Sequence, residues 1–377
     1  MKHNFIHACA GAGKTERIVR TCANPADCKK RLVITLTESG QEELVSRLSI
    51  ACTSTQMPDV MGWYSFLINH YIRPYLPNVF PHVHLTGFIF DREHHPKNHF
   101  KLGGIKRYFS DSGSVYKETL AELSVKVAEA AGGSVEHRLS RIYDEIIIDE
   151  VQDISRKSLD IIERILKTEN LHLVAVGDVR QSLLDSDLMS TKNRKADRLG
   201  LMSWYRSQEK ADRLNIKELC VTKRSNQEIA AFSDRIFPEE LGFAKTCSDN
   251  HTVTGHDGVF LIHENDLDVY LEKYRPIPLR DSARSGKHLQ KLEFRNIGKV
   301  KGLSFERVII FPTKPMLELI ADGKALKDKS ACSFYVGVTR ARASVAIIIS
   351  DQTATKRLLE NPYIPIKKWI PQTDAAQ

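Results

Sequence analysis

Short apolar runs alternate along this chain with amphipathic stretches. We expect buried strands at Phe5–Cys9, Arg31–Leu36, Glu145–Ile148, Leu171–Val176, Val308–Phe311 and Ser344–Ile349. Helical stretches fit between them, for example Lys14–Cys22 after the first strand and Gln41–Ile50 after the second. Continuous apolar runs of this length are typical of parallel strands that helices cover on both faces. The pattern therefore predicts an α/β fold with parallel sheets.

The periodicity weakens between about Leu67 and Glu136, where prolines and glycines interrupt it, and we expect an inserted subdomain there. This region also holds a group of histidines: His70, His82, His84, His94, His95 and His99. They lack neighbouring cysteines and a repeated helical spacing, so a polar surface is the preferred interpretation and a metal site the alternative.

Length and composition add constraints to this picture. A chain of 377 residues, 42% of them hydrophobic, can bury more than one core, which suggests two domains. Lys and Arg outnumber Asp and Glu by 55 to 47, and the net charge of +8 favours a polyanionic partner. The seven cysteines show no pair at the spacing of a zinc or redox site. Without a signal peptide or an apolar run of about 20 residues, we expect a soluble, cytoplasmic protein with no membrane partner.

A glycine-rich turn lies between the first predicted strand and the first predicted helix. It reads Ala8-Cys9-Ala10-Gly11-Ala12-Gly13-Lys14-Thr15. Backbone N–H groups of such a turn surround phosphate oxygens, while Lys14 adds a positive charge and Thr15 a hydroxyl ligand for Mg²⁺. Ala8 stands where the general pattern has glycine. The turn predicts a nucleotide site formed by Ala10, Gly11, Ala12, Gly13, Lys14 and Thr15.

Two further predicted strands end in polar residues. Ile146–Ile148 leads into Asp149 and Glu150, at the edge of the sheet where ligands bind. Asp149 is placed to hold Mg²⁺, and Glu150 can accept a proton from the attacking water, although an acidic loop without function would have the same sequence. The strand at Leu173–Val176 leads toward Gln181, which can sense the terminal phosphate.

These segments resemble, in sequence and in order along the chain, the motifs of superfamily 1A helicases of the UvrD/Rep group. The phosphate loop, Asp149–Asp153 and Gly177–Gln181 resemble motifs I, II and III of that family. Thr222–Ser225 resembles motif IV, Gly298–Phe305 resembles motif V, and Tyr335–Ala341 resembles motif VI. The size and motifs are also similar to the helicase-like subunit of Gabija antiphage systems.

This resemblance implies two RecA-like P-loop domains that close on one ATP in a cleft between them. Arg224 and Arg340 would then reach the γ-phosphate from the second domain, and Gly302 would also contact the nucleotide. The implied first domain covers residues 1–66 and 137–205, interrupted by a reduced 1B-like insertion at 67–136. The second domain would cover 206–377.

The resemblance fails where the family contacts the base and the sugar. No glutamine motif precedes the phosphate loop, Lys223 replaces a base-stacking tyrosine, and Ser304 replaces a glutamate near the ribose. We therefore expect weak discrimination between nucleoside triphosphates, or an adenine contact from another residue or a partner.

The nucleic-acid motifs are also altered. Thr35 lies in a segment similar to motif Ia, but Leu36 replaces the usual stacking phenylalanine, and no aromatic residue follows Gln181. Trp63, Tyr64 and Ser65 lie in a segment similar to motif Ib. Either the rings of Trp63, Tyr64 and Phe66 form a base-stacking surface, or they are buried for structural reasons.

Two functions follow from these observations. The leading hypothesis is a minimal UvrD-like ATPase that moves along single-stranded DNA, with 3′-to-5′ polarity and possible unwinding implied by the family. The alternative is a nucleotide-switched regulatory subunit of a nuclease or antiviral defence complex that does not unwind DNA. A P-loop kinase explains the phosphate loop but leaves Arg340 and its motif unexplained.

Overall fold

The structure is a computed structural model that describes residues 2–91, 101–184 and 192–371. The chain forms two compact units, one of Met1–His7 with Lys14–Lys217 and one of Ala8–Gly13 with Glu218–Gln377. A six-stranded sheet accompanies each unit, with the strand orders β3-β2-β6-β7-β1-β8 and β13-β12-β14-β15-β11-β16. All strand pairings from β3 to β1 and throughout the second sheet are parallel. The predicted α/β class with two parallel sheets is confirmed.

The first sheet has buried central strands that carry residues of both faces into the core. Its strands are β1 (His3–Ala8), β2 (Arg31–Thr35), β3 (Asp59–Gly62), β6 (Glu145–Ile148), β7 (His172–Gly177) and β8 (Leu214–Leu219). Every residue of β2 and β6 is buried, as expected of strands covered on both faces. The last two residues of β8 already belong to the second unit.

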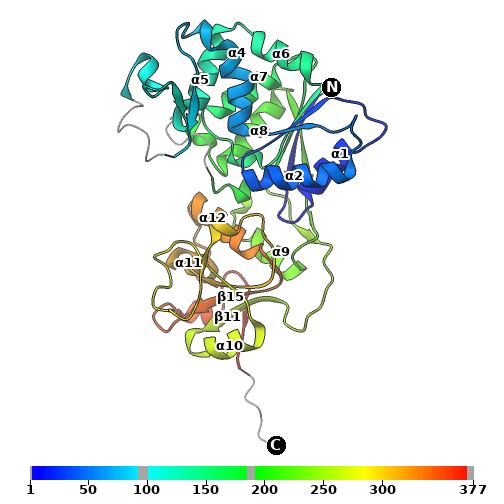
Figure 1. Cartoon of the computed structure of the whole chain (residues 1–377). Coiled ribbons are helices and arrows are strands. Elements are labelled where there is room, and N and C mark those ends of the chain that lie inside the picture. Colours follow the sequence, from blue (N-terminus) through cyan, green and yellow to red (C-terminus); the bar gives the residue numbers. More distant parts are fainter. Residues whose placement is uncertain (1, 92–100, 185–191, 372–377) are drawn as a thin grey trace, which may run out of the picture. The chain divides into compact units, whose positions relative to one another are not determined.

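Helices of the first unit bury one apolar stripe each. They are α1 (Lys14–Cys22), α2 (Glu38–Ala51), α5 (Lys117–Ala130), α6 (Ser134–Ile142), α7 (Ser158–Leu166) and α8 (Gly200–Lys210). Helix α1 has the predicted bounds, and α1 and α2 lie side by side (Figure 1). Helix α2 begins three residues before the prediction because the Thr37 side chain accepts a hydrogen bond from the Gly40 N–H at 3.1 Å and caps the helix.

The region that the sequence marks as an insertion combines helical and extended segments. It begins within a helical stretch formed by α3 (Trp63–Phe66), a π-helix (Leu67–Ile72) and α4 (Arg73–Tyr75). Two short parallel strands, β4 (Gly87–Ile89) and β5 (Ser114–Tyr116), then lead into α5, which packs against α7. The assignment of residues 67–136 to a 1B-like insertion stays a prediction.

The second unit repeats the plan of a buried parallel sheet with helices. Its strands are β9 (Val221–Thr222), β10 (Cys247–Ser248), β11 (Gly258–His263), β12 (Ile277–Arg280), β13 (Arg295–Asn296), β14 (Phe305–Phe311), β15 (Ala341–Ile349) and β16 (Lys367–Lys368). Its helices are α9 (Gln227–Asp234), α10 (Leu267–Tyr274), α11 (Lys314–Asp322), α12 (Asp328–Val338) and α13 (Lys356–Glu360).

Strands β14 and β15 each begin three residues before the predicted apolar run. Charged residues such as Glu306 and Arg342 interrupt the hydrophobic pattern there, yet Phe305 and Ala341 already pair. Backbone pairing therefore extends beyond the apolar residues from which the strand is predicted. Among the helices of the described residues, none has both the length and the apolar character needed to span a bilayer.

Candidate nucleotide-binding site

Three neighbouring strands of the first sheet end at one edge. The register pairs Ile148 with Ala175 and His7 with Gly177, so β6, β7 and β1 finish side by side. Asp149, Asp178 and the phosphate loop follow these strand ends directly. The carboxyl edge of a parallel sheet is where such folds bind ligands. The order of the strands thus brings together polar segments that are more than a hundred residues apart in sequence.

Lys14, Asp149 and Glu150 lie close together at this edge. The Lys14 Nζ is 3.8 Å from Glu150 Oε1, and the Glu150 N–H donates to Asp149 Oδ1 at 2.9 Å. Glu150 has a φ of 53°, in the left-handed region that residues with a side chain rarely adopt. Gln152 donates a hydrogen bond to the other Glu150 carboxylate oxygen. The Glu150 side chain is thus held beside Lys14 by its backbone and by Gln152.

A buried aspartate organises the neighbouring loop. Asp178 Oδ1 accepts from the backbone N–H and Nε of Arg180 at 3.1 and 3.0 Å, and Oδ2 accepts from Gln181 Nε2 at 2.9 Å. His7 Nε2 lies 3.5 Å from Asp178 Oδ1. Burial raises the pKa of Asp178, but Arg180 and His7 outweigh it and hold this pKa well below its usual range. Gln181 is therefore oriented by an ionised carboxylate.

Sequence reasoning missed His7, Asp178 and Arg180 as members of the site. The available signal was a histidine and an aspartate at the carboxyl ends of two apolar strands. Recognising it required the information that β1 and β7 are neighbours, although about 170 residues separate His7 from Asp178 in the chain.

Gln152 joins the loops after β6 and β7. Its Oε1 accepts from the Asp178 N–H at 3.1 Å, and its backbone carbonyl accepts from Ser182 Oγ at 3.0 Å. A Cβ at Gly177 would lie 2.3 Å from Gln152 Oε1, so only glycine allows this approach. Gln152 therefore connects the loop that carries Glu150 with the loop that carries Gln181.

The backbone of the phosphate loop adopts left-handed conformations that glycine permits without strain. Gly11 and Gly13 have φ values of 79° and 78°. Residues Ala8–Gly13 group with the second unit, where the Ala10 N–H donates to the Tyr335 hydroxyl at 3.2 Å and the Gly11 carbonyl accepts from the Lys223 N–H at 3.0 Å. The Ala10 N–H must leave this partner before a phosphate oxygen can accept from it.

Arg224 and Arg340 lie near each other in the second unit. Arg224 Nη1 donates to the Thr339 carbonyl at 3.2 Å. Arg340 is 1% exposed and donates to the carbonyls of Val336 and Leu303, each at 3.1 Å. The exposed Gly302, with a φ of 88°, precedes Leu303. The structure thus brings motifs IV, V and VI together, and the contact of these residues with a nucleotide stays a prediction.

The four nucleic-acid candidates differ in exposure. Trp63 and Thr35 are buried, Tyr64 is half-buried and Ser65 is exposed. Trp63 is 0% exposed and its ring packs against Phe66, so the structural alternative describes it and no ring face remains for a base. Tyr64 instead points its ring toward Phe88 and Phe90.

The histidine-rich region is the candidate for a metal site. Among the described residues, no group of three or more His, Cys, Asp or Glu side chains could hold a metal ion. His94, His95 and His99 lie outside the described residues.

Thr15 and Asp149 offer a hydroxyl and a carboxylate, the hard oxygen donors that suit Mg²⁺ when phosphates and water complete its shell.

Comparison with known proteins gives matches to a family and to solved structures. Among solved structures, the chain is similar to the Arterivirus nonstructural protein 10 (helicase), with 15% identity over 92% of this chain and 59% of that chain and a TM-score of 0.46. It is similar in the same way to the complex of that helicase with DNA, with 15% identity over 92% and 61% and a TM-score of 0.45. The chain spans about three fifths of the length of these helicase chains. No curated protein matches the sequence. Residues 1–186, which include the phosphate loop and the Asp149–Gln181 segments, match a family described as an AAA domain.

Proposed function

We propose that this chain is a Mg²⁺-dependent nucleoside triphosphatase whose substrates include ATP. The observation that carries the proposal is the convergence of Lys14, Glu150 and Gln181 at the ends of three adjacent parallel strands. The match of residues 1–186 to an AAA domain supports it. A kinase would account for the phosphate loop but not for Arg340 and the segment Tyr335–Ala341 around it.

Each residue has a distinct part in the proposed reaction. Lys14 and the loop amides bind the phosphates, and Glu150 takes a proton from the attacking water. Gln181, oriented by Asp178, positions that water or senses the γ-phosphate. Thr15 and Asp149 would hold Mg²⁺, which neutralises charge on the phosphates. Arg224 and Arg340 would stabilise the charge that develops in the transition state.

We further propose that hydrolysis drives movement along single-stranded DNA. The support is the order of six helicase-like motifs and the net charge of +8, which favours binding to a polyanion. UvrD-like 3′-to-5′ polarity belongs to the same proposal.

The test is phosphate release by the purified chain with and without single-stranded DNA. We expect DNA to raise the turnover rate, and Lys14→Ala to abolish it because the phosphates lose their only point charge from this loop. Lys210→Ala, an exposed lysine of α8, is the matched control and should behave as the wild type. Turnover that is indifferent to any nucleic acid would contradict the movement proposal and leave the triphosphatase proposal intact.

The regulatory alternative keeps one specific observation in its favour. Leu36 stands where the stacking phenylalanine of the family would be, and Trp63 is buried. A chain that binds nucleotide to signal to a partner such as a nuclease needs neither ring. Co-purification of a stoichiometric partner, with release or activation of that partner on ATP binding, would favour this function.

Base discrimination is a separate test of the site. Lys223 and Ser304 replace family residues near the base and the ribose, and we expect ATP, GTP, CTP and UTP to be hydrolysed with similar kcat/KM. A preference for ATP above about tenfold in the isolated protein would mean that another residue reads adenine.

A further inference from the structure

Three aromatic rings gather in the first unit outside the nucleotide site. The ring centroids of Tyr64 and Phe88 are 5.8 Å apart, those of Tyr64 and Phe90 5.9 Å, and those of Phe88 and Phe90 6.1 Å. Phe90 meets both other rings at steep angles, 84° to Tyr64 and 73° to Phe88. Such edge-to-face contacts fix the orientation of a ring. We call Tyr64, Phe88 and Phe90 the aromatic platform.

A short parallel ladder explains how Phe90 is held. Ile89 of β4 pairs with Tyr116 of β5, so the next residues, Phe90 and Lys117, leave the ladder side by side. The Lys117 ammonium lies 3.7 Å from the centre of the Phe90 ring and 5.1 Å from that of Tyr64. Asp91 and Glu118 also act on Lys117 electrostatically. Lys117 therefore covers one face of the Phe90 ring, while its charge is partly balanced by carboxylates.

The Phe90 side chain is half-exposed despite these contacts. Phe90 is 53% exposed, and with Tyr363 it is one of the two most exposed Phe, Tyr or Trp side chains in the described parts of the chain. A half-exposed ring whose orientation is held by its neighbours can stack on a planar ligand. The aromatic platform thus has the form of a binding surface as well as that of a packing cluster.

The platform lies toward the same edge of the sheet as the phosphate loop. Gly62, the last residue of β3, pairs with Thr35 at the carboxyl end of β2, and Tyr64 follows two residues later. Because β2 neighbours β6, this edge is the one that carries Asp149. A ligand on the platform would touch a segment, Gly62–Phe66, that is joined directly to the sheet of the nucleotide site.

We propose that the exposed ring of Phe90 stacks on an unpaired base of single-stranded nucleic acid. This inference rests on the nucleic-acid dependence proposed above and names the surface that provides it. Every base has a flat π-face, so such a contact tolerates any sequence, and it replaces the rings that are missing at Leu36 and after Gln181. The net charge of +8 favours the phosphates of the same strand.

The experiment measures binding of fluorescent dT and rU oligonucleotides to the full chain and to three variants. Phe90→Ala should weaken binding about fivefold to a hundredfold, the range found for loss of one base–aromatic stack. Phe90→Leu keeps apolar area but has no ring and should also bind weakly. Phe90→Trp should bind as tightly as the wild type, and its added tryptophan fluorescence should be quenched by the oligonucleotide. The matched control is Tyr363→Ala, which removes a ring of similar exposure in the second unit and should leave binding unchanged.

An abasic oligonucleotide of the same length separates stacking from charge. The wild type and Phe90→Ala should bind it equally weakly, because neither has a base to stack on. If the wild type binds dT and Phe90→Ala binds it equally well, the stacking inference is overturned and the proposed nucleic-acid dependence survives. If Phe90→Leu alone binds like the wild type, the ring face is not used and the inference also fails. Absence of any binding by the wild type overturns both proposals.

Discussion

The two edges of the first sheet carry charged residues of the same kinds in opposite arrangements. At the amino edge, Arg31, Glu145 and His172 stand at the starts of β2, β6 and β7 and pair in register, Arg31 with Glu145 and Glu145 with His172. At the carboxyl edge, Lys14 at the start of α1 and Glu150 in the loop after β6 lie beyond the strand ends, with Lys14 Nζ 3.8 Å from Glu150 Oε1. Neighbours within a ladder are fixed by the strands themselves, whereas residues of the following loops are not held by strand pairing.

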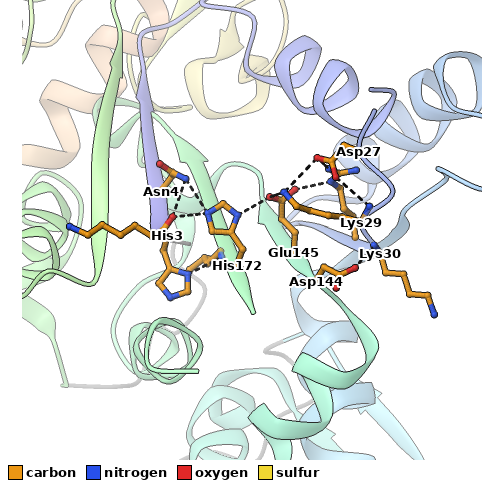
Figure 2. A network of polar contacts seen from close by, with 11 residues as sticks. His3, Asn4, Asp27, Lys29, Lys30, Asp144, Glu145 and His172 are labelled. Carbon is orange, nitrogen blue, oxygen red and sulfur yellow. Dashed lines mark hydrogen bonds and ion pairs between the residues drawn. The ribbon is translucent and has the colours of Figure 1, made fainter. Parts of the chain in front are cut away.

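Glu145 is the centre of the amino-edge network, and this residue is only 3% exposed. Its carboxylate accepts from Arg31 Nε at 2.7 Å and lies 2.8 Å from His172 Nδ1 and 3.6 Å from Lys29 Nζ. Figure 2 shows Glu145 between His172 on one side and Lys29 and Asp27 on the other. Charges of opposite sign pair within this network, Arg31 and Lys29 with Glu145 and Asp27, as expected of a network that stabilises the fold.

The carboxyl edge leaves charge available. The Glu150 side chain is 31% exposed and that of Lys14 11%, and the ion pair between them is longer than a hydrogen bond. The difference teaches that similar residue types serve stability or chemistry according to whether they lie inside the ladder or just after it. Four predictions test this division, from the largest expected effect to the smallest.

Glu150→Gln should remove the proposed general base without disturbing the fold. We expect the turnover rate to fall about 10²- to 10⁴-fold, with nucleotide affinity retained because the amide keeps the shape of the carboxylate. The free energy of unfolding should change by less than about 0.5 kcal/mol. Phosphate-release kinetics and urea unfolding measure the two effects, and Glu42→Gln, an exposed carboxylate of α2, is the control. A large loss of stability in Glu150→Gln would mean that the carboxyl edge is also structural.

Glu145→Ala should destabilise the fold and leave the turnover rate nearly unchanged. Removing this carboxylate leaves the Arg31 guanidinium buried without its main partner, and we expect a loss of about 3–5 kcal/mol of unfolding free energy. The turnover rate per folded molecule should stay within about twofold of the wild type. If the alanine variant does not fold, Glu145→Gln retains one hydrogen bond and should give a smaller loss. A variant that folds normally but hydrolyses slowly would contradict the division between the edges.

The pH dependence of stability should also belong to the amino edge. Burial raises the pKa of Glu145, but hydrogen bonds from His172 and Arg31 outweigh it and lower this pKa to about 2 from an ordinary 4.5. The stabilisation by the ionised carboxylate is therefore present above about pH 4.5 and lost as the pH falls toward 2, an effect of about 3 kcal/mol.

The measurement is urea unfolding of the wild type and Glu145→Gln between pH 7 and pH 2.5. The difference in unfolding free energy should be constant above pH 5 and shrink below it. Burial lowers the pKa of His70 to about 4, which also destabilises the fold in acid, but this effect is common to both proteins and cancels in the difference. A difference that does not change with pH would show that the charge of Glu145 is unimportant.

These two edges also show how far the sequence alone leads. The segment after β6 is visible in the sequence because an apolar run ends in Asp149, whereas the pairing of Asp178 with His7 follows only from the order of β7 and β1 in the sheet. The Glu145 network is invisible in the sequence, because its register depends on which strands are neighbours. The aromatic platform is equally hidden, since β4 and β5 are three residues long and Phe90 meets Tyr64 only through the ladder. Local patterns predict elements, and contacts between distant elements require the fold.

Thr37→Ala gives the smallest effect and tests whether the carboxyl edge contributes to stability at all. Thr37 lies just beyond β2 at this edge, and its hydroxyl accepts from the Gly40 N–H to cap α2. Alanine cannot accept this bond, and we expect a loss of about 1 kcal/mol of unfolding free energy. Thr37→Ser keeps the oxygen and should lose only a few tenths of that amount. Urea unfolding of both variants at pH 7 measures the difference. A loss of unfolding free energy as large as that of Glu145→Ala would mean that the carboxyl edge contributes strongly to stability. The expected small loss would agree with a mainly ligand-binding role for this edge.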